Sequence, residues 1–106
     1  MRQALPVIFR EEALSDIEQI VRYLRDQGAS LRAAHAFVER IENKCRRIGG
    51  VPEGNSLRPD LGPDIRLAPF ERSAVILYCL TEATVEIVRI YYGGRDYQSL
   101  LSDKPS

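Results

Sequence analysis

The stretch that decides the fold is the last third of the chain, Val85-Glu-Ile-Val-Arg-Ile-Tyr-Tyr-Gly-Gly-Arg-Asp-Tyr-Gln-Ser-Leu-Leu101. The β-branched and aromatic residues of its first half are typical of a β-strand. A glycine pair then breaks this strand and places Arg95, Asp96 and Tyr97 directly after its end. Such a cluster is either a surface ion pair that contributes little to stability or a recognition site on a loop. The spacing alone leaves both interpretations open.

Two more strands are predicted before this one. Ile65–Phe70 alternates between two faces, and Pro69 suits a strand at the edge of a sheet. Ala74–Leu80 is an unbroken apolar run, as expected of a central strand covered on both faces. The gaps between the strands are short, with turns at Glu71-Arg72 and Glu82-Ala83. The three strands are therefore predicted to form an antiparallel meander.

The first half of the chain predicts a short strand, Leu5–Phe9, followed by a helical hairpin. The first helix begins near Glu11 and ends at Gly28, and the second is capped by Ser30 and ends at Gly49-Gly50. Each helix carries one apolar stripe at helical spacing. The stripes consist of Ala13, Leu14, Ile17, Ile20, Val21 and Leu24, and of Ala34, Phe37, Val38, Ile41, Cys45 and Ile48.

These elements define an α+β fold in the order β-α-α-β-β-β. The helical hairpin is expected to pack on one face of a small, mainly antiparallel, curved sheet. Between the helices and the meander lies Val51–Asp64, whose three prolines and two glycines predict a loop without regular structure. A loop of this length in so small a domain indicates a functional or partner-facing segment.

Composition narrows the class of protein. The chain has 106 residues, which predicts one domain over residues 1–106, with Ser102–Ser106 as a flexible tail. Its 15 basic and 15 acidic side chains cancel, which argues against broad or sequence-specific binding of nucleic acid. No signal peptide or membrane span is visible, so we expect a cytoplasmic protein.

The side chains that enzymes and metal sites need are scarce. Cys45 and Cys79 lie inside apolar segments and are expected to be reduced core residues, and His35 has no partner at ligand spacing. No nucleophile elbow, phosphate loop or dinucleotide fingerprint is present. We therefore expect no metal, no cofactor and no catalytic residue.

What remains on the predicted sheet is a set of arginines and tyrosines, the residue types of interface hot spots and of phosphate or base binding. Arg89 is the sharpest case, because it interrupts an apolar strand, where a charge is costly unless exposed or paired. Alternation places it on the face of Val85, Ile87 and Tyr91, which we expect to be open to solvent or to a partner. The candidate target-binding or partner-binding residues are Arg66, Arg89, Tyr91, Tyr92, Arg95, Asp96 and Tyr97.

Four stretches of the chain carry a resemblance to a known family. They are Phe9–Ala13 with Asp16–Leu24, Ala36–Ile41, Leu57–Arg66 and Val85–Asp96. In this order and at this separation the pattern resembles the ParE branch of the RelE/ParE superfamily, the toxins of type II toxin–antitoxin modules.

The resemblance implies one of two activities. RelE-type members cut messenger RNA in the ribosome with strand arginines and lysines and a tyrosine near the C-terminus. Carried over, Arg95 falls on a family arginine and Arg66 lies near a basic position, but Val75 occupies the central-strand arginine position and Leu101 lies near the tyrosine position. ParE-type members poison DNA gyrase without a recognised catalytic centre, and the Gly-x-Arg-Asp ending is usual among them.

The resemblance favours a ParE-like gyrase inhibitor, which would not be an enzyme. It also implies a ParD-like antitoxin whose C-terminal segment wraps the toxin, on the outer face of the helical hairpin or on the last strands. Two alternatives stay open: a RelE-like, ribosome-dependent endoribonuclease, and a non-toxic module that only binds its antitoxin.

Overall fold

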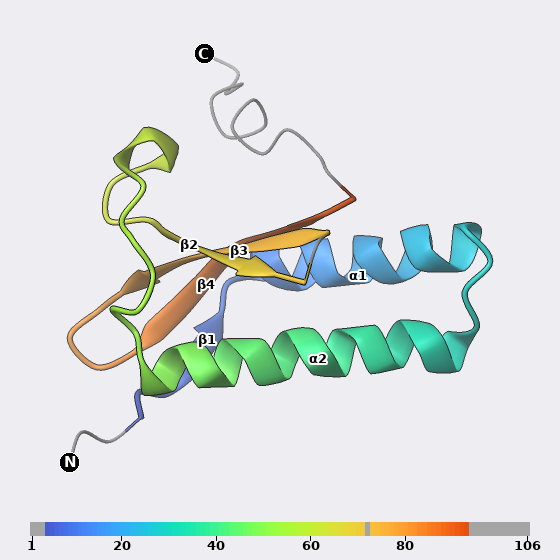
Figure 1. The fold of residues 1–106 in the computed structure, drawn as a ribbon, viewed down its shortest axis with the longest axis horizontal. Coiled ribbons are helices and arrows are strands. Elements are labelled where there is room, and N and C mark those ends of the chain that lie inside the picture. Colours follow the sequence, from blue (N-terminus) through green and yellow to red (C-terminus); the bar gives the residue numbers. More distant parts are fainter. Residues whose placement is uncertain (1–3, 72, 94–106) are drawn as a thin grey trace.

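A computed structural model describes residues 4–71 and 73–93 of the chain. Its elements follow in the order β1 (Val7–Phe9), α1 (Glu11–Asp26), α2 (Leu31–Gly50), the 3-10 helix η1 (Pro59–Leu61), β2 (Arg66–Phe70), β3 (Ala74–Leu80) and β4 (Val85–Tyr92). The predicted α+β fold and its strand and helix order are confirmed (Figure 1). The predicted flexible tail, Ser102–Ser106, lies outside the described residues.

The four strands form one sheet in the order β1-β4-β3-β2. The predicted meander is confirmed, because β3 pairs antiparallel with both β2 and β4, and Pro69 lies on the edge strand. β1 pairs in parallel with β4, so the first and the last strand of the sequence are neighbours in the sheet. The strand is shorter than the predicted Leu5–Phe9, since the Leu5 N–H donates to the Gly49 carbonyl at the end of α2.

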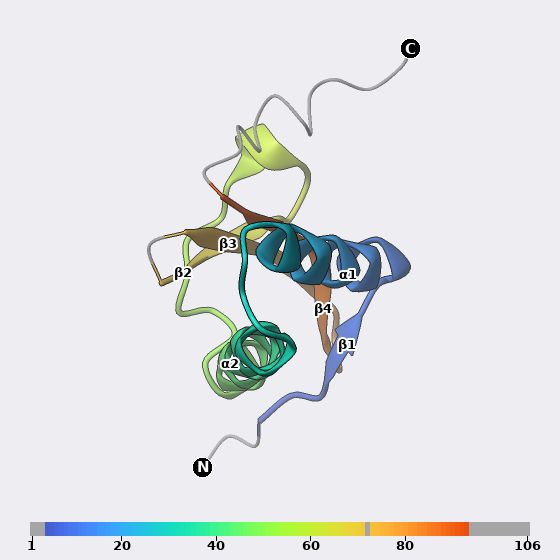
Figure 2. The same ribbon diagram turned by 90° about the vertical axis from the view of Figure 1, so that its right-hand side faces the viewer.

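The two helices cover one face of the sheet, with α1 along β4 (Figure 2). Ser30 caps α2 as predicted, because its hydroxyl accepts from the Ala33 N–H at 3.0 Å. Gly28 follows α1 with a φ of 97°, a conformation that favours glycine. The predicted stripe of α1 is wrong at one position: Leu14 is 48% exposed, while Asp16 is buried.

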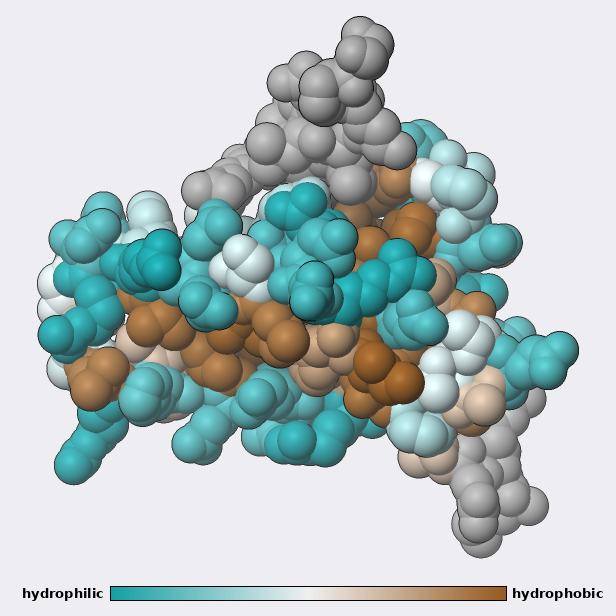
Figure 3. All heavy atoms as spheres, turned by 180° about the vertical axis from the view of Figure 1, so that it is seen from behind, coloured by the Kyte–Doolittle hydropathy of each residue, from teal (hydrophilic) through white to brown (hydrophobic). Residues whose placement is uncertain are grey.

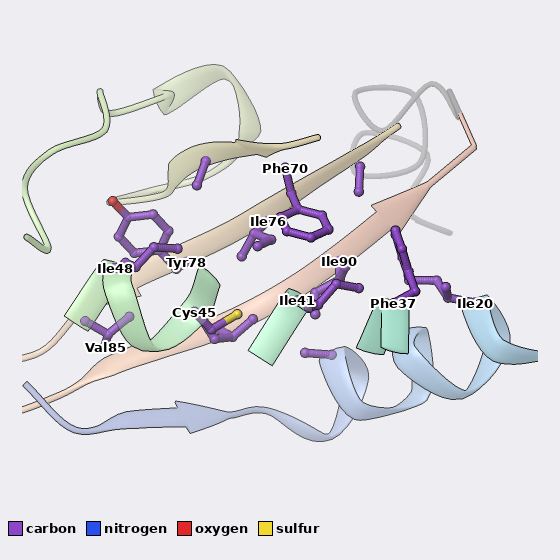
Figure 4. Close-up of a cluster of buried hydrophobic side chains, with 14 residues drawn as sticks. Ile20, Phe37, Ile41, Cys45, Ile48, Phe70, Ile76, Tyr78, Val85 and Ile90 are labelled. Atoms are coloured by element: carbon purple, nitrogen blue, oxygen red, sulfur yellow. The ribbon is translucent and has the colours of Figure 1, made fainter. Parts of the chain in front are cut away.

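The main core lies between the hairpin and the sheet (Figure 4). Phe37 meets Phe70 and Tyr92 edge to face, with ring centroids 5.7 and 5.0 Å apart. Such pairs add to the stabilisation from apolar burial. The deeply buried members include Ile41, Cys45, Ile48, Ile76, Tyr78, Val85, Ile87 and Ile90.

A β-bulge in β4 changes which side chains share a face. Leu77 pairs with Arg89 but Tyr78 pairs with Ile87, so Val88 is an extra residue in β4. Simple alternation therefore fails, and the prediction that Arg89 shares a face with Val85 and Ile87 is wrong. Val85 and Ile87 belong to the helix-side core, whereas Tyr91 packs on the opposite face with Leu61 and Leu77.

The loop before the meander is more ordered than predicted. It contains η1, and Leu57 forms a bridge with Arg66 at the start of β2. The buried Tyr78 hydroxyl donates to the Pro52 carbonyl at 2.9 Å and accepts from the Asn55 amide at 3.2 Å. These bonds hold the loop to the sheet, and Leu61 covers the face of β3 that the helices leave open, so β3 is covered on both faces as expected.

The cysteines differ in their surroundings. Cys45 and Cys79 are both free, and Cys45 is buried as predicted. Cys79 is only half-buried and lies on the sheet face away from the helices, where Arg10 Nη2 donates to its sulfur at 3.4 Å. Only Cys45 is therefore a residue of the main core.

Candidate functional site

The end of β4 is fastened to α1 by a single carboxylate. β1 stops at Phe9, and within residues 4–71 and 73–93 no strand pairs with the outer edge of β4 beyond this point. Asp16 of α1, 5% exposed, occupies this edge and accepts from the Ile90 N–H at 2.9 Å. The same carboxylate accepts from Arg89 Nε at 2.8 Å and from Nη2 at 2.9 Å.

The electrostatics of this pair favour the charged arginine. The hydrogen bond to Asp16 raises the pKa of Arg89 above its ordinary value, while partial burial acts against it. The Arg89 guanidinium also lies over the Tyr91 ring, 4.9 Å from its centroid. Arg89 is therefore not a free cation on an open face: it is half-buried and paired, which is the condition under which a charge in this strand is tolerated.

The neighbouring tyrosines are parts of the packing. Tyr91 is buried in the small cluster with Leu61 and Leu77. Tyr92 meets the rings of Phe37 and Tyr23, the latter at 5.7 Å. Between α1 and the end of β4 lies a small cavity of about 90 Å³, lined among others by Asp16, Gln19, Tyr23, Tyr91 and Gly93.

The structure brings together only some of the predicted site residues. Arg89 and Tyr91 are in contact, and Tyr92 adjoins them on the other face of β4. Arg66 lies on β2, two strands away, where its Nη1 donates to the Asn55 carbonyl at 2.5 Å. Arg95, Asp96 and Tyr97 lie outside the described residues, so their role stays a prediction.

Sequence reasoning missed Asp16, although a signal for it exists. An acidic residue stands between Ala13 and Ile20 on the buried side of α1, at the spacing of the apolar stripe. A carboxylate at such a position needs a partner of opposite charge. Arg89 was the candidate, because it interrupts a strand that is otherwise apolar.

Other cations near the sheet are held in the same way. Arg10, directly before α1, binds Glu86 of β4 through its Nε and Nη2 at 2.9 and 2.8 Å. This hydrogen bond raises the pKa of Arg10. Arg58 forms a two-pronged bond with Asp60 in the loop. Each of these arginines, like Arg66 and Arg89, thus already binds a group of the chain itself.

A partly exposed apolar surface runs along the hairpin. We call it the hairpin strip: Leu14, Ile17, Val21, Leu24, Leu31 and Val38, which are exposed or half-buried. Figure 3 shows apolar atoms along the length of the hairpin with hydrophilic rows on both sides. Contiguous apolar surface of this kind often marks a protein-binding site.

Two kinds of site are not found among residues 4–71 and 73–93. No three His, Cys, Asp or Glu side chains there stand close enough to hold a metal ion together. No helix in the same residues has the length and apolar character that spanning a bilayer requires.

These features define the class of protein: a small α+β domain with a helical hairpin on one face of a four-stranded sheet and an apolar strip along the hairpin. The sequence profile of the ParE toxin of type II toxin–antitoxin systems, parDE, matches residues 7–97. The chain therefore belongs to the ParE toxin family, as the resemblance implied.

Solved structures agree with this assignment in fold. The chromosomal ParDE system from P. aeruginosa matches with a TM-score of 0.72 and 18% identity, covering 85% of this chain and 97% of that one. The toxin–antitoxin complex RelBE2 from Mycobacterium tuberculosis matches with a TM-score of 0.56 and 22% identity, covering 85% and 99%. A search of curated protein sequences gives no match.

Proposed function

We propose that this toxin acts by binding DNA gyrase, without catalysis of its own, and that a ParD-like antitoxin neutralises it. The observation that carries the proposal is the match of residues 7–97 to the ParE toxin family. The cleavage of RNA requires groups that activate a 2′-hydroxyl and stabilise charge on phosphate. The side chains of the sheet support the proposal physically, because their pairing does not favour RNA cleavage.

The arginines of the described sheet are occupied by internal partners. Arg89 binds Asp16 and Arg66 binds the Asn55 carbonyl. These bonds hold Nε and Nη2 of Arg89 and Nη1 of Arg66, so turning either guanidinium fully towards a phosphate would leave a carboxylate or a carbonyl without its donor. Val75, at the position where the resemblance places a central-strand arginine, packs against the cluster of Leu61 and Tyr91 instead. These contacts support protein recognition over RNA cleavage.

The antitoxin is expected to cover apolar surface. An amphipathic helix binds through apolar side chains at helical spacing laid into a groove. The hairpin strip offers apolar surface for such a helix, with Leu14 and Leu31 about half exposed. Binding there would remove this surface from water, which is the main source of affinity in protein association.

A supercoiling assay with purified gyrase tests the target. We expect the chain to inhibit supercoiling at micromolar concentration and to accumulate cleaved DNA, since a poison arrests gyrase on its substrate. A translation extract with a defined messenger RNA serves as the parallel arm. If gyrase stays active but transcripts are cut, the chain is an endoribonuclease and the gyrase proposal is wrong. If gyrase stays active, transcripts stay intact and the chain still binds its antitoxin, it is a non-toxic module.

A further inference from the structure

The open face of the sheet, opposite the helices, contains an apolar groove that the described residues leave partly uncovered. This sheet groove has a volume of about 350 Å³ and lies between the loop before β2 and the strands β3 and β4. Its walls include Leu61, Ile65, Leu77, Cys79 and Val88, and Arg10 stands at its border. We infer that the chain's own C-terminal segment covers the sheet groove, with Leu100-Leu101 as its apolar anchor. This inference does not rest on the gyrase proposal.

The end of β4 directs the chain towards the open face. Gly93 follows the strand with a φ of 85°, a conformation that favours glycine and suits a reversal of the chain. Its N–H donates to the Ser73 carbonyl at 2.9 Å, which keeps this point next to β3. The helix side of the strand end is already filled, because Tyr92 packs there against the rings of Phe37 and Tyr23. A chain that turns back after Gly93 therefore runs over the open face.

The length of the segment matches the position of the groove. Val88 stands five residues before Gly93, which corresponds to about 17 Å of strand. Leu100 stands seven residues after Gly93 and can reach about 23 Å from it when the chain is extended. The leucine pair therefore reaches the sheet groove with enough chain left over for the turn itself.

The composition of the segment also fits the groove. The stretch Tyr97–Ser102 carries no charge, and the nearest charged residues are Asp96 before it and Asp103 after it. Among the described residues that line the sheet groove, only Arg10 is charged, and it already binds Glu86. An uncharged segment can thus enter the groove without leaving a charge unpaired. The charged residues on either side of it stay in water.

The leucine pair can fill the groove in either register. Adjacent side chains of an extended segment point to opposite sides, so one of Leu100 and Leu101 faces the sheet whichever way the segment lies. Burial of that side chain against Ile65 and Val88 removes apolar surface from water on both partners.

Attachment to β4 favours this segment over a free partner. A short tether gives its own segment an effective concentration on the order of millimolar at the groove. One buried leucine side chain then suffices for occupancy, whereas a free peptide with the same contacts would bind too weakly. The sheet groove of the free chain is therefore assigned to residues of the chain itself.

Labelling of the Cys79 thiol tests the inference, because Cys79 is part of the groove wall. An aromatic disulfide reagent reaches this thiol only while the segment is away from the groove. The double variant Leu100→Ser with Leu101→Ser should therefore raise the labelling rate of Cys79 at least several-fold. The rate in the parent chain should not depend on protein concentration, since the protecting segment belongs to the same molecule.

A matched double variant controls for the loss of two leucines. Leu14→Ser with Leu31→Ser removes leucines that are 48% and 52% exposed on the hairpin, and should leave the labelling rate of Cys79 unchanged. The buried Cys45 should stay unlabelled in every variant, which shows that the fold is intact.

Disulfide formation gives a second, direct measurement of position. At least one of Leu100→Cys and Leu101→Cys should cross-link to Cys79 under a mild thiol oxidant, because a disulfide requires Cα atoms within about 7 Å of each other. Leu14→Cys, on the hairpin, should not cross-link to Cys79.

Three results would overturn the inference. The first is an equal labelling rate in the parent chain and in the leucine-pair variant, which would leave the groove open to a separate partner. The second is protection of Cys79 that increases with protein concentration, which would assign the groove to a second copy. The third is the absence of both cross-links.

Discussion

The carboxylate of Asp16 in α1 binds the guanidinium of Arg89 in β4 through two hydrogen bonds of 2.8 and 2.9 Å. It also receives the Ile90 N–H at the open edge of the strand. One side chain thus closes a sheet edge and neutralises a charge. Because Arg89 leads directly to the C-terminal end of β4, this link fixes the point from which the chain continues towards Arg95 and Asp96.

Asp16→Ala should lower the free energy of unfolding by about 2–4 kcal/mol. The change removes every acceptor of Arg89 in this site and of the Ile90 N–H, and leaves a half-buried cation behind. Arg89→Ala should cost a similar amount, because Asp16 is then a buried carboxylate without its cation. Urea unfolding followed by circular dichroism measures both.

Glu18→Ala is the matched control for this pair. Glu18 is an exposed carboxylate in the middle of α1, so its removal should change stability by no more than about 0.5 kcal/mol. If Arg89→Ala leaves stability unchanged but abolishes toxicity, Arg89 is a recognition residue and its structural role is refuted.

Local patterns predicted most of the fold, and tertiary contacts account for what they missed. The hairpin, the meander and the Ser30 cap follow from signals within a few residues of each other. The bulge at Val88 cannot be predicted in this way, because no residue of Val85–Tyr92 distinguishes a strand with an extra residue from a regular one. Simple alternation therefore assigned Arg89 to the wrong face.

The candidate site shows the same division. Arg89 was singled out by its cost in an apolar strand, but its partner Asp16 lies 73 residues away, and no local rule joins the two. Arg66 was selected for its charge, whereas the structure uses it to hold the Asn55 carbonyl. Residue type alone singled out Arg66 and Arg89 as important, but only their tertiary contacts show that both stabilise the fold.

The two glycines that end α2 should respond in opposite ways to alanine. A Cβ on Gly49 would stand 2.5 Å from the Leu5 carbonyl oxygen, which is too close for a carbon atom, and a backbone oxygen cannot move aside as a flexible side chain can. A Cβ on Gly50 would meet nothing within 4 Å. Gly49→Ala should cost about 1–3 kcal/mol. Gly50→Ala should be neutral or stabilise by up to about 1 kcal/mol, since alanine is the better helix former. Thermal unfolding of both variants gives the comparison, and equal melting temperatures would refute the close contact at Leu5.

The two thiols should differ in reactivity. Burial raises the pKa of Cys45 to about 12, so its thiolate is scarce at any mild pH. Cys79 is half-buried, and its pKa is raised by burial while Arg10 acts to lower it. An aromatic disulfide reagent should therefore label Cys79 in the native protein and Cys45 only after unfolding. A Cys79→Ser variant should show no labelling without denaturant, and rapid labelling of that variant would contradict the burial of Cys45.

The same thiol gives a dependence of stability on pH. The unfolded Cys45 ionises near its ordinary pKa of 9.0, whereas the folded one does so only near 12. The raised folded pKa means that this contribution is complete below pH 9.0 and is lost as the pH rises towards 12. Cys45→Ala should remove this part of the decline, so the stability curves of the variant and the parent chain should converge as the pH rises. Parallel curves would show that Cys45 ionises equally in both states.

Arg66 and Arg95 should separate stability from function. Arg66 donates to the Asn55 carbonyl and helps to hold the loop against β2, so Arg66→Ala should lower the free energy of unfolding by about 1.5–3 kcal/mol, the range for a hydrogen bond to a charged group.

Arg95 follows the end of β4, outside the described residues, and is predicted from the sequence to contact the target. Arg95→Ala should therefore weaken gyrase inhibition at least tenfold while leaving the urea midpoint unchanged. Arg66→Lys, which retains the charge but has a single nitrogen, is the matched control for the loop contact. If Arg95→Ala lowers stability as much as Arg66→Ala does, Arg95 belongs to the fold and the recognition role assigned to it is wrong.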